Sequence, residues 1–204
     1  MQKIMFNEQY GLQSATLKRD KWNTRRWLSN DKFKRFWWDE EKQLIYYANT
    51  FDNELVAPRE LQPKYKIGEV VAIAQSYGDI LASEYLPPRK EDEVCRLVSE
   101  NHIGCTNKMF VRAELMPHHI QITGIKVERL QDISDEDCLA EGIYRRDDVI
   151  DLNLRPVVRY QFYGTPSLFV TPKEAYHALI DKVCGIRTWD ENPWMVAYAY
   201  KLKD

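Results

Sequence analysis

The chain has 204 residues, enough for one domain with a substantial core, and its 44% hydrophobic and 29% charged residues are ordinary for a globular protein. A formal net charge of −2 excludes a global field that would draw the whole molecule to nucleic acid or to an anionic membrane. No stretch approaches the roughly 18 apolar residues of a membrane span, and the N-terminus lacks the apolar run of a signal peptide. We therefore expect one domain over residues 1–204, located in the cytoplasm, with no membrane partner.

Positive charge is concentrated near the start of the chain. Between Lys18 and Arg35 stand eight basic residues and only two acids, Asp20 and Asp31, a balance of +6 on an otherwise acidic chain. Tryptophan and phenylalanine are interleaved with these cations, which is the composition of a platform for stacking unpaired bases. A hydrophobic core or a subunit interface is the alternative for these rings. The segment predicts a basic patch on an acidic body.

Three elements are predicted in the first half of the chain. A helix is expected from about Glu8 to Arg19, with Asn7 as its N-cap. An apolar run rich in β-branched residues, Gly68 to Tyr77, predicts a buried strand. Residues 83–108 are polar and begin near the sequence LPPRKEDE, which indicates an insertion that runs over the surface.

The middle of the chain combines a strand with a capped helix. Isoleucine and valine alternate from His119 to Leu130, and Gly124 stands where a β-bulge would reset the alternation. Ser134 is a typical N-cap, the three acids after it suit the positive end of a helix dipole, and Gly142 ends the helix.

A second insertion, residues 144–165, precedes the last helix and strand. Thr171 and Glu174 form a capping box around Pro172, and Gly185 stops this helix. Alternating residues from Pro193 to Leu202 predict a closing strand. Short strands with helices at separated points favour an α+β fold, with a small mixed β-barrel and flanking helices, over an alternating βαβ sheet.

The cysteines favour no metal centre. All four lie far apart and are expected to be free thiols of a reducing compartment: Cys95, Cys105, Cys138 and Cys184. A metal site can be drawn, but its spacing matches no standard zinc pattern, with ligands at Cys95, His102, Cys105 and the pair His118–His119. We expect neither a metal nor a cofactor.

Four phrases in the chain resemble a known family. These are LKRDKWNTRR, YKIGEVVAIAQSY, ITGIKVERLQDISDEDCLAEGI and AYHALIDKVCGIRTWDENPWMVAYAYKL. Their order and spacing are similar to those of the ASCH family, most closely its phage- and Bacteroides-type members, over perhaps two thirds of the chain. The resemblance implies a PUA-like mixed β-barrel with a cleft that accepts RNA, a nucleotide or a modified nucleoside.

The resemblance also implies candidate catalytic residues. One branch of the family consists of amidohydrolases that remove the acetyl group from N4-acetylcytidine without a metal. Their K-x-x-T pair falls on Lys21 and Thr24 of this sequence, and their glutamate falls on Glu141. Lysine, threonine and carboxylate make a workable set for amide hydrolysis, namely a base, a nucleophile and a proton shuttle. Each also has a structural interpretation, as a solvated lysine, a turn hydroxyl and an exposed last-turn acid.

Binding residues are expected beside this trio. Adjacent guanidinium groups at Arg25 and Arg26 suit phosphate capture, with Lys18 as a further cation and Trp22 as a stacking ring. Trp22 departs from the family pattern, which has threonine after the lysine. The family's arginine–glutamate pair is likewise replaced, here by Ala74 and Gln75, which weakens the catalytic interpretation.

Three other function classes remain open at this stage. The same residues would serve a non-catalytic RNA-binding module, a ribonuclease, or an interaction protein with no nucleic-acid partner. The sequence predicts neither the natural substrate nor the oligomeric state.

Overall fold

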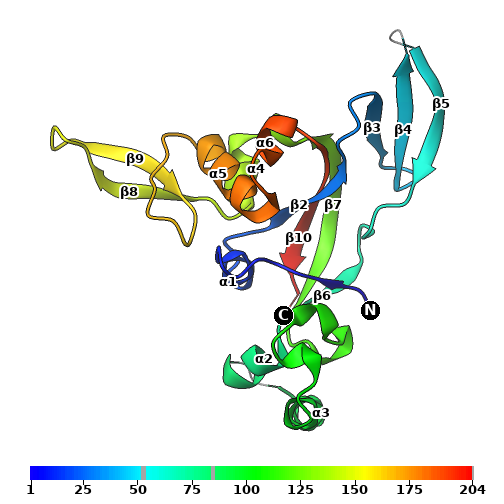
Figure 1. The fold of residues 1–204 in the computed structure, drawn as a ribbon, viewed down its shortest axis with the longest axis vertical. Helices are drawn as coiled ribbons and strands as arrows, with labels where there is room; N and C mark the ends of the chain where they lie inside the picture. Colours follow the sequence, from blue (N-terminus) through cyan, green and yellow to red (C-terminus); the bar gives the residue numbers. More distant parts are fainter. Residues whose placement is uncertain (52–53, 84–85, 204) are drawn as a thin grey trace.

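The structure is a computed structural model that describes residues 1–51, 54–83 and 86–203. These residues form ten β-strands in three sheets together with six α-helices, so the predicted α+β class is confirmed. Figure 1 shows a central sheet flanked by helices, with two smaller sheets that extend away from it.

The central sheet has five strands in the order β1–β6–β7–β10–β2. Its edge strand β1 runs parallel to β6, and the other neighbours are antiparallel. The strands are β1 (Lys3–Ile4), β2 (Asn23–Ser29), β6 (Val70–Ile73), β7 (His119–Arg129) and β10 (Trp194–Leu202). The two alternating segments near the middle and the end of the sequence thus pair with each other at the centre of the sheet.

The predicted bulge at Gly124 is confirmed. Gly124 pairs with Ala199, but the next residue of β10, Tyr200, pairs with Ile122, so the register shifts by one residue here. Because side chains alternate between the faces of a strand, this extra residue changes which positions face the core. Ile120 and Ile122 are fully buried on one side of the shift.

Two smaller sheets project from this body (Figure 1). One has three strands, β3 (Lys34–Asp39), β4 (Leu44–Phe51) and β5 (Glu54–Leu61). The other is a hairpin of β8 (Tyr144–Ile150) and β9 (Pro156–Gln161), which occupies the predicted insertion 144–165. Among the described residues the three sheets stay separate and the central one keeps an open strand order, so no closed barrel is observed.

The first helix is shorter than predicted. Helix α1 covers Leu12–Leu17, and Asn7 does not cap it, because Gly11 occupies the N-cap position in the left-handed conformation with φ of +63°. A Cβ at Gly11 would also lie 2.8 Å from Tyr163 Cβ and 2.9 Å from the ring atom Cγ. Because of this glycine, the helix begins later in the sequence than predicted, and Tyr163 can pack closely against the backbone at Gly11.

The two other predicted helices are confirmed with their caps. In α4 (Asp135–Ala140) the Ser134 side chain accepts a hydrogen bond from the backbone of Asp137. In α5 (Pro172–Cys184) Thr171 and Glu174 form the capping box. A short α6 (Thr188–Glu191) follows before β10.

The predicted surface insertion 83–108 is instead part of a packed helical unit, and the predicted strand 68–77 ends early at Ile73. We call residues 77–116 the helical insert. It contains a buried apolar cluster that includes Tyr77, Ile80, Val94 and Leu97. The spacing of Val94 and Leu97 places both on one helix face, which packs this polar-looking segment into a buried cluster that also includes Ala72 of β6. Its elements are α2 (Tyr77–Ser83), α3 (Pro88–Ser99) and the 3-10 turns η1 (Ile103–Cys105), η2 (Lys108–Phe110) and η3 (Ala113–Leu115).

The helices were compared with the requirements of a membrane span. Within the described ranges, none of them combines the length and the apolar character needed to cross a bilayer.

Candidate functional site

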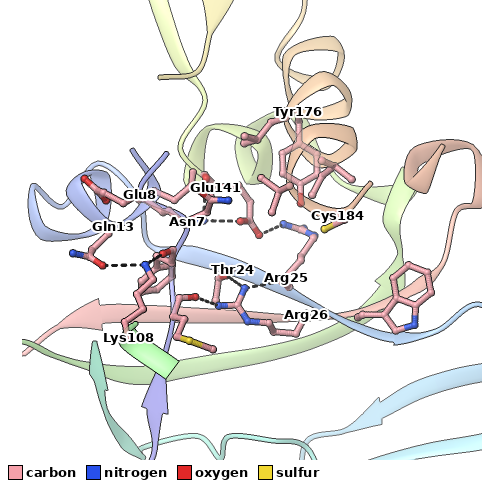
Figure 2. Close-up of a pocket in the computed structure, with 18 of the residues that line it drawn as sticks. Asn7, Glu8, Gln13, Thr24, Arg25, Arg26, Lys108, Glu141, Tyr176 and Cys184 are labelled. Atoms are coloured by element: carbon pink, nitrogen blue, oxygen red, sulfur yellow. Dashed lines mark hydrogen bonds and ion pairs between the residues drawn. The ribbon is translucent and has the colours of Figure 1, made fainter. Parts of the chain in front are cut away.

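A cavity of about 680 Å³ opens where six segments of the chain meet. Its walls come from the segment that joins β1 to α1, from β2, from the residue that follows α4, from α5, from β10 and from the helical insert. Figure 2 shows Thr24, Arg25, Arg26, Glu141 and Lys108 directed toward this space. The three predicted catalytic residues, Lys21, Thr24 and Glu141, all line it.

Backbone pairing brings Lys21 beside Glu141 across 120 positions of sequence. The N–H of Trp22 donates to the carbonyl of Ala140 at 3.0 Å, which ties the start of β2 to the end of α4. Gly142 follows Glu141 with φ of +104°, and a Cβ there would lie 3.6 Å from Lys21 Cδ and 3.2 Å from Leu12 Cδ2. The helix-ending glycine therefore both turns the chain and leaves room for the lysine stem.

Lys21 is almost fully buried, with 2% of its surface exposed, which overturns the solvated-surface interpretation. Its Nζ donates to Glu141 Oε2 at 2.6 Å, to the Glu141 carbonyl at 2.9 Å and to the Asn23 carbonyl at 2.5 Å. An ammonium has three donors, so all of them are used. Burial lowers the pKa of Lys21, an effect opposed by Glu141 and reinforced by Arg26 and Arg25.

Arg25 is held by carboxylates rather than left open for a phosphate. Its Nε and Nη2 donate to Glu128 Oε1 at 3.1 and 2.5 Å, Nη2 also reaches Asp137 Oδ2 at 2.9 Å, and Nη1 reaches Glu141 Oε1 at 3.1 Å. Burial acts to lower the pKa of this guanidinium, but the negative charge around it, Glu141 first, outweighs burial and raises it. The geometry therefore assigns Arg25 to positioning Glu141, in place of the phosphate contact expected from the sequence.

Thr24 and Arg26 share one face of β2, as residues two apart in a strand do. The Thr24 hydroxyl is buried and accepts a hydrogen bond from Arg26 Nη1 at 2.8 Å. Arg26 is half-buried and also donates to the carbonyls of Arg25 and Met5, at 3.1 and 2.8 Å. Within the described part of the chain, no carboxylate forms an ion pair with Arg26.

Lys18 and Trp22 do not join the cavity. Both are exposed, Trp22 by 51%, and both line a separate groove of about 610 Å³ on the other side of α1. Tyr144, Tyr163 and Arg145 contribute to the same groove. The predicted stacking ring and the predicted extra cation therefore lie outside the site that holds the trio.

Sequence reasoning missed several residues of the site. Glu128 and Asp137 lie within the phrase VERLQDISDED, so a signal was present, but neither was selected. Lys108, from the helical insert, has no local signal at all. Tyr176 of α5 also lines the cavity, and its buried hydroxyl has no hydrogen-bond partner in the described structure. Burial raises the pKa of Tyr176 well above its usual value, so the phenol stays neutral.

The geometry offers no metal centre in the described residues, where no group of three or more histidine, cysteine or acidic side chains is placed to hold an ion. The four cysteines are free thiols. Burial raises the pKa of Cys138 to about 12, which keeps that thiol protonated.

Comparison of the chain with protein-family models, with curated proteins and with solved structures gives no match in any of the three.

Proposed function

We propose that this protein is an ASCH-type, PUA-like protein that binds a nucleoside or nucleotide in the cavity and hydrolyses an N4-acylated cytidine-type amide there. The observation that carries the proposal is the convergence of Lys21, Thr24 and Glu141 on one cavity. An ammonium and a carboxylate 2.6 Å apart, beside a hydroxyl oriented by a guanidinium, supply the groups that amide hydrolysis requires.

The reaction follows from the protonation state of Lys21. Its neutral form has two donors for its three acceptors, so one contact opens and the nitrogen lone pair is available to the Thr24 proton. The Thr24 oxygen then attacks the acyl carbon, and the bond from that carbon to the exocyclic nitrogen breaks. The proton passes through Glu141 to the leaving nitrogen, and water releases the acyl group from Thr24. The lowered pKa of Lys21 makes the neutral amine more accessible near neutral pH.

Incubation of the purified protein with N4-acetylcytidine tests this reaction. The rate of deacetylation is measured from the change in ultraviolet absorbance. We expect this rate to fall at least about 100-fold in Lys21→Met, because a general base contributes about 10²–10⁴-fold to the rate. Lys18→Met is the matched control, since Lys18 belongs to the same basic run but is exposed outside the cavity. Absence of turnover in the wild type, or equal losses in the two variants, would falsify the hydrolase.

A non-catalytic RNA-binding module is the second candidate. It is favoured by the separate groove, which combines the exposed rings of Trp22, Tyr144 and Tyr163 with Lys18 and Arg145. Aromatic rings beside cations suit single-stranded RNA. The RNA-binding module predicts salt-sensitive RNA binding that is weaker in Trp22→Ala. If the wild type binds RNA in this way but neither deacylates nor cleaves it, the module is favoured over the hydrolase and the ribonuclease.

A further inference from the structure

The hydrogen bonds of Arg26 leave part of its guanidinium open to the cavity. A guanidinium has five N–H donors. In Arg26, Nη1 uses two of them, on the Thr24 hydroxyl and the Arg25 carbonyl, and Nη2 uses one on the Met5 carbonyl. Within residues 1–51, 54–83 and 86–203, the Nε–H and the second Nη2–H have no hydrogen-bond acceptor. The acceptors in use are neutral and the ring centroid of Phe6 lies 5.9 Å from the guanidinium carbon, so no anionic group among the described residues compensates the positive charge of Arg26 by contact.

Lys108 presents a second cation of the same kind from the helical insert. Its Nζ donates to the carbonyl of Phe6 and to Gln13 Oε1, the latter at 3.4 Å, so one of its three donors remains for a ligand within the described structure. Its anchor on Phe6 lies next to Met5, the residue that accepts from Arg26. One short segment of the chain thus holds both cations at the cavity wall. Figure 2 shows Arg26 and Lys108 beside the cavity.

Two acids also line this part of the cavity, but each is held by other groups. Glu8 accepts from the backbone and hydroxyl of Ser14, and Asp79 accepts from the Ser76 hydroxyl at 2.6 Å. Neither lies within ion-pair distance of Lys108 among the described contacts. Burial lowers the pKa of Lys108, while Glu8 and Asp79 act in the opposite direction and favour its charged form.

We infer that Arg26 and Lys108 form a phosphate subsite, so that the ligand of the cavity is a nucleoside 5′-monophosphate rather than a free nucleoside. Three N–H donors on two cations match a phosphate monoester, which carries a charge of about −1.5 to −2 at pH 7 and three strong acceptor oxygens. An internal phosphodiester carries a charge of only about −1, against about −1.5 to −2 for the monoester, and the nucleic-acid chain would have to leave the cavity on both sides of it. The inference rests on the proposed nucleotide-binding function and names its substrate class.

Isothermal titration with cytidine 5′-monophosphate and with cytidine tests the subsite. We expect the wild type to bind the monophosphate at least about tenfold more tightly, equivalent to about 1.4 kcal/mol. Lys108→Gln should remove most of this difference and leave cytidine binding unchanged. Arg89→Gln is the matched control, because it removes an exposed cation of the same helical insert that does not line the cavity. Thermal unfolding of both variants checks that they are folded.

The outcomes separate the subsite from the function. Equal affinity for the two ligands, or equal losses for both in Lys108→Gln, overturns the subsite while nucleoside binding stands. If neither ligand binds, the nucleotide function fails, and inorganic phosphate becomes the probe. Phosphate binding that is lost in Lys108→Gln then supports an anion site, whereas no phosphate binding overturns it. Equal binding of the dinucleotide CpC, whose only phosphate is a diester, overturns the monophosphate assignment.

Discussion

Arg25 and Arg26 are neighbours in the sequence, but the structure gives them opposite surroundings. Arg25 is buried and contacts three carboxylates, those of Glu128, Asp137 and Glu141. Arg26 is half-buried and contacts one hydroxyl and two carbonyls. Because successive residues of a strand face opposite sides, adjacent arginines can serve different tasks. The comparison teaches that the number of cations in the basic run does not show how many of them can bind an anionic ligand. That depends on the groups that each cation already contacts within the protein.

The same distinction extends to the two lysines of the cavity. The Lys21 ammonium pairs with a carboxylate and is nearly fully buried, whereas Lys108 is held by a carbonyl and an amide oxygen. We call Lys21, Arg25, Glu128, Asp137 and Glu141 the carboxylate network. Its members stabilise one another, and among the described cations that line the cavity, Arg26 and Lys108 lie outside the network and remain to attract an anionic ligand.

The largest expected effect comes from breaking the carboxylate network at its centre. Arg25→Met removes the one cation that contacts all three of Glu128, Asp137 and Glu141, although Lys126 still reaches Glu128 and Asp137 and Lys21 still pairs with Glu141. Removing one partner of a buried ion pair costs about 3–5 kcal/mol. We therefore expect the free energy of unfolding, measured in urea, to fall by that amount. Arg145→Met is the control, since the Arg145–Asp147 pair is exposed on the hairpin and should matter little. Comparable losses in the two variants would show that Arg25 carries no special structural role.

A smaller effect is expected from the ionisation of Lys21. Its pKa is lowered by burial, so between that lowered value and the usual 10.5 the unfolded chain binds more protons than the folded one. In this window the contribution of Lys21 to the free energy of unfolding increases as pH rises, and it is lost as pH falls through the lowered pKa. The quantity to measure is the difference in unfolding free energy between wild type and Lys21→Met at several pH values.

Taking that difference also removes the tyrosines from the comparison. Burial raises the pKa of Tyr65 to about 12 and raises that of Tyr200 further, so both stabilise the fold less as pH rises above the usual tyrosine pKa of 10.0. The wild type and Lys21→Met share these tyrosines, so their contributions cancel in the difference in unfolding free energy. A difference that stays flat from about pH 7 to 10, or decreases, would contradict a lowered pKa for Lys21.

Local signals in the sequence predicted local structure well. The caps at Ser134 and Thr171 and the bulge at Gly124 depend on residues a few positions apart, and all three are confirmed. The limits of helix α1 were missed because Gly11 has a tertiary role, packing against Tyr163, which propensity does not describe. The α+β class followed from such elements, whereas the arrangement of three separate sheets depends on contacts distant in sequence.

The two predicted insertions show where sequence reasoning stopped for the site. The segment 144–165 forms a projecting hairpin, in keeping with a surface insertion (Figure 1). The segment 83–108 was given the same interpretation, but buried Val94 and Leu97 pack it into the helical insert, which delivers Lys108 to the cavity. Lys108 is one lysine in a polar stretch, and only the fold distinguishes it. Lys21, Thr24 and Glu141 were selected through a resemblance, since 117 positions separate Thr24 from Glu141.

The smallest effect on stability is expected at Arg26, which sharpens its contrast with Arg25. Arg26→Gln removes hydrogen bonds to neutral acceptors on a half-buried strand, each worth about 0.5–1.5 kcal/mol net, and leaves no buried carboxylate unpaired. The three bonds of this half-buried residue, each at the lower end of that range, sum to about 1.5 kcal/mol, so we expect a loss of about that size in unfolding free energy, below that of Arg25→Met. The same variant should weaken cytidine 5′-monophosphate about tenfold, because Arg26 supplies two of the three open donors. A loss of stability as large as that of Arg25→Met, with ligand affinity unchanged, would place Arg26 among the structural cations and remove the contrast between the two arginines.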